Sequence, residues 1–316
     1  MRLIVSILLL LIASAEAYAQ RSFEHDILRD TFGFDETTRK TVALGDLNQG
    51  CSARDCIPSI DNPKYVSVNE ADQVSDDDVV IALSWKGEYR AYPARILDHH
   101  EIVNDTIAGT PISITWCPLC GSAVGIHREV AGHVTEFGVS GVLYNSDLVL
   151  YDRATNTLWD QIIAEGIVGE LTGEKLKMIP VSMTTWGRWK TAHPDTLVLS
   201  IDTGFEKDYS VDRYAEYRDS ARLMFSVQQT DERVHPKTVV FGFQVGDSKV
   251  AFTEALLKER PSITHDLNGR QVTVTMKDDG SVLLVTDDGE QYSPIRLFWF
   301  AWYTFYPQTS LVTATK

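Results

Sequence analysis

The stretch Val79-Val80-Ile81-Ala82-Leu83 is followed by Lys86-Gly87-Glu88 and then by a second run from Tyr89 to Tyr92. Two apolar or β-branched runs separated by a short glycine-containing turn are typical of a β-hairpin. We therefore expect two antiparallel strands here. Pro93 suits the first turn of a helix, which we expect to continue to Ile102.

The same pattern of strands and tight turns recurs along the chain. Residues 111–116 are another expected strand, and further hairpins are predicted around Ala131-Gly132-His133, Gly246-Asp247 and Asp278-Asp279-Gly280. The expected helices are short, from Thr184 or Thr185 to Ala192 and from Thr253 to Arg260. The strand–helix alternation of a doubly wound sheet is not seen. The sequence predicts an α+β, β-rich fold of mostly antiparallel strands and hairpins with short helices, in one main domain.

The N-terminus has the pattern of a secretory signal. Arg2 is followed by an apolar run from Leu3 to Ala13 and by the small-residue site Ala17-Tyr18-Ala19. About eleven apolar residues are too few for a membrane span, which needs roughly 20. We predict a signal peptide over residues 1–19, an N-terminal arm over 20–60 and the β-rich domain over 61–316. The mature chain is expected to be exported, to the periplasm or the extracellular space, without a transmembrane segment.

Composition excludes several classes of protein. The 316 residues are 44% hydrophobic and 23% charged, which excludes a disordered chain. The formal net charge of −15 argues against nucleic acid as a partner, and no other partner is indicated. Four cysteines are too few for a disulfide-stapled miniprotein. The densely aromatic run from Ile295 to Tyr306 is expected to lie in the core.

The sharpest chemical feature is Cys117-Pro118-Leu119-Cys120-Gly121. Two cysteines at this spacing converge on one metal ion, and a glycine lets the backbone close the turn. The expected flanking strands favour such a metal knuckle, because the redox version of the motif normally begins a helix. Three interpretations stay open: metal ligands, a redox-active dithiol or a structural disulfide. Covalent haem attachment is excluded, since Gly121 and not histidine follows Cys120.

A second group of metal-binding residue types lies one expected strand earlier, in Asp98-His99-His100-Glu101. Two thiolates with an imidazole suit a soft or borderline ion, copper or zinc. We predict His100 as the third ligand and Glu101 as a fourth or neighbouring group, whereas His99 is expected to cover a surface turn. The other cysteines, Cys51 and Cys56, have the wrong spacing for a second knuckle and are interpreted as a local disulfide, with completion of a four-sulfur metal site as the alternative.

Polar residues are dense between positions 138 and 161, where the surrounding pattern is that of strands. Tyr144, Asn145, Asp147 and Trp159 are therefore candidates to line a pocket, although Asn145-Ser146-Asp147 is also a good turn by itself. Gly138-Val139-Ser140-Gly141 is not the nucleophile elbow of hydrolases, because its second glycine comes one position early. No nucleotide, haem or flavin motif is present in the sequence.

Several of these strings, taken in order, resemble a prokaryotic family named only as domain of unknown function 3179. The strings that carry the resemblance are His100-Glu101-Ile102-Val103-Asn104-Asp105, Cys117-Pro118-Leu119-Cys120-Gly121-Ser122, Phe137-Gly138-Val139-Ser140-Gly141, Tyr144-Asn145-Ser146-Asp147-Leu148, Tyr151-Asp152-Arg153 with Thr157 and Trp159, and His193-Pro194-Asp195-Thr196. The resemblance implies no particular reaction. It favours His100, Glu101, Cys117 and Cys120 over His99 as site residues.

Three functions follow from the sequence. The first is an exported metal-binding protein that holds copper or zinc through Cys117, Cys120, His100 and Glu101. The second is a thiol–disulfide oxidoreductase in which Cys117 attacks, Cys120 resolves, and Glu101 or His100 transfers protons. The third is a non-enzymatic binding or structural module with a static Cys117–Cys120 disulfide.

Overall fold

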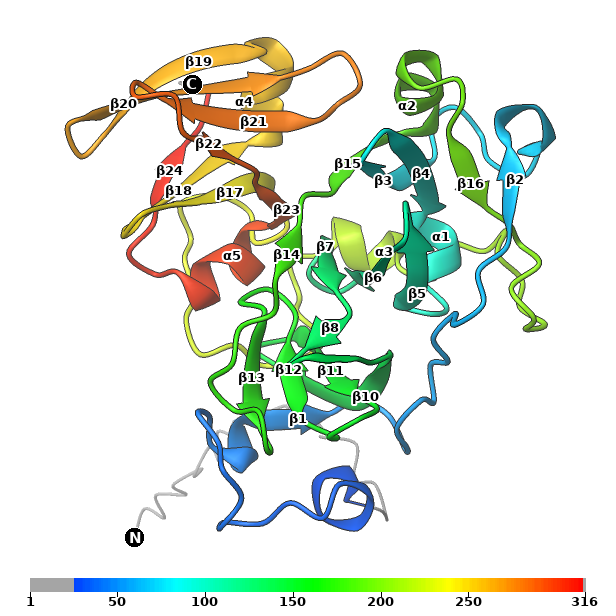
Figure 1. Ribbon diagram of the computed structural model, residues 1–316. Coiled ribbons are helices and arrows are strands. Elements are labelled where there is room, and N and C mark those ends of the chain that lie inside the picture. The colour runs from blue at the N-terminus through cyan, green and yellow to red at the C-terminus, as the bar shows by residue number, and fades with distance from the viewer. Residues whose placement is uncertain (1–25, 315–316) are drawn as a thin grey trace, which may run out of the picture.

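A computed structural model describes residues 26–314 (Figure 1). The predicted signal peptide lies outside these residues. Strands in several mostly antiparallel sheets dominate, and the helices are short, so the predicted β-rich α+β fold is confirmed. Figure 1 shows the sheet that contains β6 and β7 between the C-terminal strands, the β3–β4 sheet and the β10–β13 sheet.

The predicted hairpin of residues 79–92 is present as β3 (Val79–Trp85) and β4 (Glu88–Pro93). It belongs to a five-stranded sheet in the order β15-β3-β4-β16-β2. The other members are β15 (Ser182–Thr185), β16 (Leu197–Leu199) and β2 (Tyr65–Ser67). The short helical turn η3 (Val68–Glu70) follows β2 in the chain. Helix α2 (Trp186–Ala192) begins after Thr185, as predicted, and buries Trp186 and Trp189.

The sheet that carries the cysteine motif has the order β14-β7-β6-β5. Its strands are β5 (Ile102–Ile107), β6 (Thr110–Cys117), β7 (Ser122–His127) and β14 (Met178–Ile179). The helix predicted to reach Ile102 is shorter than expected, because α1 spans only Ala94–Leu97. Glu101 has a left-handed φ of 57° and turns the chain into β5. A right-handed helix cannot continue through a residue in this conformation.

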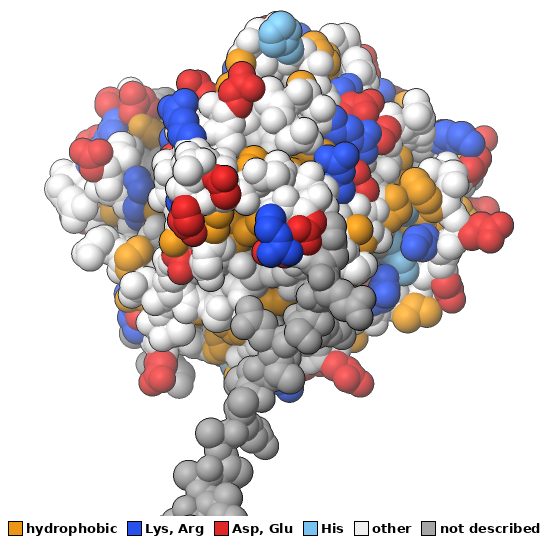
Figure 2. Space-filling view, turned by 90° about the horizontal axis from the view of Figure 1, so that it is seen from below, with side chains coloured by type: hydrophobic (Ala, Val, Ile, Leu, Met, Phe, Trp, Pro, Cys, Tyr) orange, Lys and Arg blue, Asp and Glu red, His pale blue; other side chains and the backbone are white. Residues whose placement is uncertain are grey.

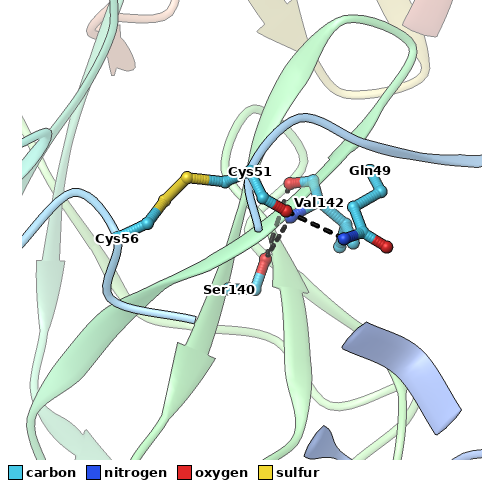
Figure 3. The surroundings of a disulfide bond; sticks show 5 residues. All are labelled: Gln49, Cys51, Cys56, Ser140 and Val142. Carbon is cyan, nitrogen blue, oxygen red and sulfur yellow. Dashed lines mark hydrogen bonds between the residues drawn. A yellow bond between two sulfur atoms is a disulfide. The ribbon is translucent and has the colours of Figure 1, made fainter. Parts of the chain in front are cut away.

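The N-terminal residues lie against a third sheet, in the order β1-β10-β11-β12-β13. Its strands are β1 (Leu47–Gln49), β10 (Phe137–Tyr144), β11 (Asp147–Asp152), β12 (Leu158–Asp160) and β13 (Glu165–Val168). Two short helical turns, η1 (Ile27–Thr31) and η2 (Leu44–Asp46), precede β1. The predicted Cys51–Cys56 disulfide is present beside β10, and Gln49 Nε2 donates to the Cys51 carbonyl at 2.9 Å (Figure 3).

The C-terminal part contains two four-stranded sheets, in the orders β23-β17-β18-β24 and β19-β20-β21-β22. The first is built from β17 (Val239–Val245), β18 (Ser248–Thr253), β23 (Ile295–Phe298) and β24 (Ser310–Val312), and the second from β19 (Ser262–Leu267), β20 (Arg270–Met276), β21 (Val282–Thr286) and β22 (Gln291–Tyr292). The hairpins predicted at Gly246-Asp247 and Asp278-Asp279-Gly280 are both present. The hairpin predicted at 131–133 is small, with β8 (Glu129–Val130) and β9 (His133–Val134).

The aromatic run near the C-terminus is core, as predicted. It forms β23 and helix α5 (Trp299–Phe305), and the side chains of Trp299 and Trp302 are fully buried. A Cβ added at Gly242 would lie 2.3 Å from the Trp302 ring, so the ring packs directly on the backbone of β17. Helix α4 (Glu254–Glu259) is present where a helix was predicted before Pro261.

Between β16 and β17 runs a long irregular segment, residues 200–238, which we call the strap. Its one helix in the described structure is α3 (Ala215–Asp219). Loops of this length with little secondary structure of their own are uncommon in compact domains. The strap reaches the cysteine motif, as described below.

No helix within residues 26–314 is long and apolar enough to cross a membrane. On the face seen in Figure 2, acidic and basic side chains are interspersed and hydrophobic side chains are scattered among them. The negative net charge is therefore not gathered into one acidic patch on this face.

Candidate metal centre

The cysteine motif forms a tight turn between β6 and β7. Cys117 ends β6 opposite Ser122, and both thiols are buried, with residue exposures of 2% and 0% for Cys117 and Cys120. Gly121 has a φ of 60°, and a Cβ there would lie 2.9 Å from the Phe298 ring. Only glycine fits such a position, because it combines a left-handed conformation with a close contact. Phe298 N donates to the Cys120 carbonyl at 2.8 Å, which ties the turn to β23.

The turn between β10 and β11 brings a carboxylate to the two thiols. Asn145 and Ser146 have φ values of 51° and 65°, so the chain reverses tightly before Asp147. The Cys120 thiol points to the Ser146 carbonyl, with a sulfur–oxygen distance of 3.3 Å. Ligand atoms of Cys117, Cys120 and Asp147 all lie within 4.8 Å of one another. Two sulfurs and one oxygen therefore converge on a single buried point.

The three acids lack a cationic partner. Asp147 Oδ2 accepts a hydrogen bond from Ile162 N at 3.1 Å, but Asp147 Oδ1 and Ser146 Oγ are buried without a partner. Among residues 26–314, no Lys or Arg forms an ion pair with Cys117, Cys120 or Asp147. Burial and repulsion by Asp160 and Cys117 raise the pKa of Asp147. An unpartnered buried acid is costly unless it stays protonated or binds a cation.

The two thiols differ in acidity. Burial would raise the pKa of Cys117, but hydrogen bonds from the Cys120 thiol and from backbone N–H groups, including that of Leu148, bring it below the usual value. Burial and the proximity of Cys117 and Asp147 raise the pKa of Cys120. Cys117 is therefore the sulfur that ionises first.

Two further carboxyls lie nearby. Glu101 follows α1, and burial together with Cys117 and Asp98 raises its carboxyl pKa. Its carboxylate has no hydrogen bond to any residue that the structure describes. Asp98 accepts a hydrogen bond from Trp116 Nε1 at 2.8 Å, and burial raises its pKa to about 6. The sequence-predicted Glu101 thus lies beside Cys117, but outside the group of three converging ligand atoms.

The structure places His100 in a different network. Its Nδ1 lies 2.8 Å from the Pro58 carbonyl and its Nε2 lies 2.6 Å from the Tyr209 hydroxyl. Both ring nitrogens are therefore engaged, and burial lowers the pKa of His100 to about 4. His100 is absent from the group of converging ligand atoms. His99, expected at the surface, is buried, with its Nδ1 3.5 Å from an Arg213 nitrogen.

Of the four pocket candidates predicted from the sequence, only Asp147 belongs to the group of converging ligand atoms. Asp147 lies at the thiols, and Asn145 shapes the turn before it while its Oδ1 accepts from Gln228 N at 2.8 Å. Tyr144 donates to Gln228 Oε1 at 3.3 Å, away from the sulfurs. Trp159 is fully buried and donates to Asp152 Oδ2 at 3.0 Å.

Asp160 and the strap also border this site, although neither was singled out from the sequence. Asp160 ends β12, its Oδ2 is buried without a partner, and burial raises its pKa to about 7. The strap covers the cysteine turn through α3, where the Tyr217 hydroxyl donates to the Leu119 carbonyl at 3.1 Å. The Lys237 ammonium lies 3.7 Å from the centre of the Tyr217 ring and donates to the Arg222 carbonyl at 2.7 Å. The signal for Asp160 was its place in the polar stretch of residues 138–161, and the signal for the strap was its unusual length without periodicity.

Replacing Tyr217 by Phe is expected to expose the thiols more often. The change removes the hydroxyl that bonds Leu119, a loss of about 1 kcal/mol, which corresponds to roughly a fivefold rise in the open population. The rate at which Ellman's reagent modifies metal-free native protein measures this. Tyr292→Phe, at a tyrosine remote from the site on β22, is the control and should leave the rate unchanged. Equal rates in the wild type and Tyr217→Phe would mean that this bond does not hold the strap closed.

Comparison with known proteins gives a family but no reaction. No curated protein and no solved structure matches the chain. A family model described as a protein of unknown function (DUF3179) matches residues 54–292, well over half of the chain, and so includes both the cysteine turn and Asp147. The resemblance seen in the sequence strings is thereby confirmed, and the chain belongs to the DUF3179 family.

Proposed function

We propose that this is an exported metal-binding protein in which Cys117, Cys120 and Asp147 hold one zinc or copper ion. The observation that carries the proposal is the convergence of three buried ligand atoms within 4.8 Å of one another. Asp147 takes the role of third ligand that the sequence suggested for His100. Glu101 remains beside Cys117 as a carboxylate able to accept a proton or to approach the open side of the ion.

The donor set favours zinc over copper. Thiolates suit both zinc and cuprous copper, whereas a carboxylate oxygen suits zinc better than the soft cuprous ion. A dication also compensates the acids that now repel one another without a partner. Three protein ligands leave a fourth position for water or substrate, which is typical of catalytic rather than structural zinc sites.

The oxidation state of the cysteines agrees with metal binding. Cys51 and Cys56 are bonded to each other, whereas Cys117 and Cys120 are separate thiols in the same structure. In an oxidising compartment, neighbouring thiols form a disulfide unless a ligand or a protein cover keeps them reduced. A bound ion and the covering strap both supply that protection. The Cys51–Cys56 disulfide is compatible with export.

A second candidate function is thiol–disulfide exchange. The opposite pKa directions of the two thiols support it, since Cys117 ionises readily while Cys120 keeps its proton near Asp147. In this function the Cys117 thiolate attacks a substrate disulfide, which forms a mixed disulfide and releases one substrate thiol. The Cys120 thiolate then attacks the Cys117 sulfur, which releases the second substrate thiol and leaves the protein oxidised as a Cys117–Cys120 disulfide. The full burial of both sulfurs disfavours it unless the strap opens.

Elemental mass spectrometry with free-thiol counting, on protein purified from its export compartment, tests the proposal. We expect about one zinc per chain and two free thiols, with the metal lost in Cys117→Ser. Asp152→Asn is the matched control, because it removes an equally buried carboxyl outside the ligand group and should keep the metal. Metal-free protein whose Cys117 and Cys120 are oxidised would reject metal binding and favour thiol exchange.

A further inference from the structure

A groove of about 320 Å³ lies outside the cysteine turn, between two parts of the fold. One wall comes from β3, β4, β15 and α2, and the other from the β20–β21 hairpin and β23. None of its lining residues belongs to the strap, the cysteine turn or the β10–β11 turn. The volume falls within the usual range for small-molecule sites, which often lie where two packed units meet.

The second wall is fixed to the first. Arg188 of α2 donates from Nε to the Asp278 carbonyl at 2.9 Å and from Nη2 to the Lys277 carbonyl at 2.8 Å. Gly280 has a φ of 86°, and a Cβ there would lie 2.1 Å from Thr184 Oγ1 on β15. The tip of the hairpin is therefore seated on β15, and the groove exists without a ligand to form it.

A histidine is held rigidly at one side of the groove. The His193 ring stacks on Tyr89 at 4.3 Å between centroids and lies 4.0 Å from the Trp189 ring. Its Nε2 lies 3.3 Å from Asp279 Oδ2, and the other ring nitrogen has no hydrogen bond among residues 26–314. His193 begins the string His193-Pro194-Asp195-Thr196, which the candidate metal centre does not use.

The lining has spare hydrogen-bond donors and more cations than anions. Its charged residues are Lys277, Arg296 and Asp279, besides His193, in a chain whose formal net charge is −15. Arg296 uses Nε on Glu254 at 2.9 Å and Nη1 on Met183 Sδ at 3.9 Å, which leaves Nη2 without a bond to any described residue. The Lys277 ammonium likewise has no hydrogen bond to any described residue. Nor do the hydroxyl groups of four serines in the lining, Ser84, Ser182, Ser281 and Ser293.

We propose that this groove binds a small organic anion. Its carboxylate or phosphate lies against Lys277 and Arg296, where the serine hydroxyls supply further donors. Its apolar part packs on Phe241, Met183 and Val181, which line the same groove. The site is independent of the metal centre, and neither needs the other to be occupied.

Isothermal titration calorimetry on metal-free protein tests this with three probes: benzoate, phenyl phosphate and the neutral benzyl alcohol. We expect at least one anion to bind about tenfold or more tightly than benzyl alcohol, the worth of one charged hydrogen bond. Lys277→Met should weaken that anion by about tenfold. Lys207→Met removes an exposed strap lysine outside the groove and is the matched control.

Ser293→Trp supplies a second variant with little risk to folding, because Ser293 is exposed at the edge of the groove. The indole should block the groove and abolish anion binding. Binding of neither anion at about ten millimolar overturns the proposal, since that is weaker than any useful site. Equal binding of benzyl alcohol, or unchanged anion binding in both Lys277→Met and Ser293→Trp, overturns it as well.

Discussion

Metal-free protein will lose unfolding free energy as the pH rises above about 7. Glu101 and Asp147 are buried carboxyls whose pKa values are raised well above the usual range, whereas Asp160, with a pKa of about 7, has largely lost its proton there. The folded chain therefore holds protons that the unfolded chain has already released, and stability falls until each folded pKa is passed. His100 and Cys117, whose pKa values are both lowered, act in the opposite direction. With a pKa of about 4, His100 has completed its effect near pH 7, whereas Cys117 reduces the loss above it.

Urea denaturation in the presence of a chelator measures this slope, and Glu101→Gln should flatten it. The amide keeps the size of the side chain and removes the proton that the folded state retains. Asp288→Asn is the control, because Asp288 is exposed and its pKa is lowered to about 2, so it titrates far below this window. An unfolding free energy that rises with pH contradicts the expectation. So does a pH dependence that is as steep in Glu101→Gln as in the wild type.

Asp147→Asn should separate metal affinity from stability. Loss of a ligand oxygen is expected to weaken zinc binding by at least about 100-fold, more than loss of a residue that only supports a ligand. In chelator at pH 8 the same variant should be more stable than the wild type by about 1–3 kcal/mol, because a neutral amide replaces an unpartnered buried acid. Chelator competition and thermal unfolding give the two readings.

Asp152→Asn is the matched control for that experiment, since Asp152 is equally buried in the same strand. All of its contacts are satisfied: Asp152 Oδ2 accepts from Trp159 Nε1 at 3.0 Å and Oδ1 accepts from Thr155 N at 2.7 Å. We expect it to destabilise the chain by about 1–3 kcal/mol and to keep zinc. If Asp147→Asn instead retains zinc, or destabilises the metal-free chain as Asp152→Asn does, Asp147 is a structural residue.

Local features of the fold could be predicted because neighbouring residues determine them. Lys86 and Gly87 both have positive φ, as a tight hairpin turn requires, and the run before them has β-forming side chains. The helix after Thr185 begins where a capping residue type stands. The expected length of the helix after Pro93 was wrong, because the left-handed Glu101 is not encoded by any glycine or asparagine at that position.

The site could be predicted only in part, because its members meet through packing between distant segments. Cys117 and Cys120 are three positions apart in the sequence, but Asp147 reaches them from another sheet, and the sequence left open whether its region shares their pocket. His100 has partners 42 residues before it and 109 residues after it, which no local pattern encodes. The strap, which lacks any periodic pattern, decides what covers the thiols.

Oxidative folding of this chain has to join Cys51 to Cys56 and leave Cys117 and Cys120 as thiols. The first pair is half-exposed and the second is buried. Four cysteines can form three complete pairings, and the shortest loops close most readily. The strap, which covers Cys117 and Cys120, begins some 80 positions after Cys120 in the chain. Until it has folded over them, these two thiols are open to non-native disulfides with Cys51 and Cys56. We therefore expect chains that close the strap first to keep both thiols, and chains that oxidise earlier to bury a non-native disulfide.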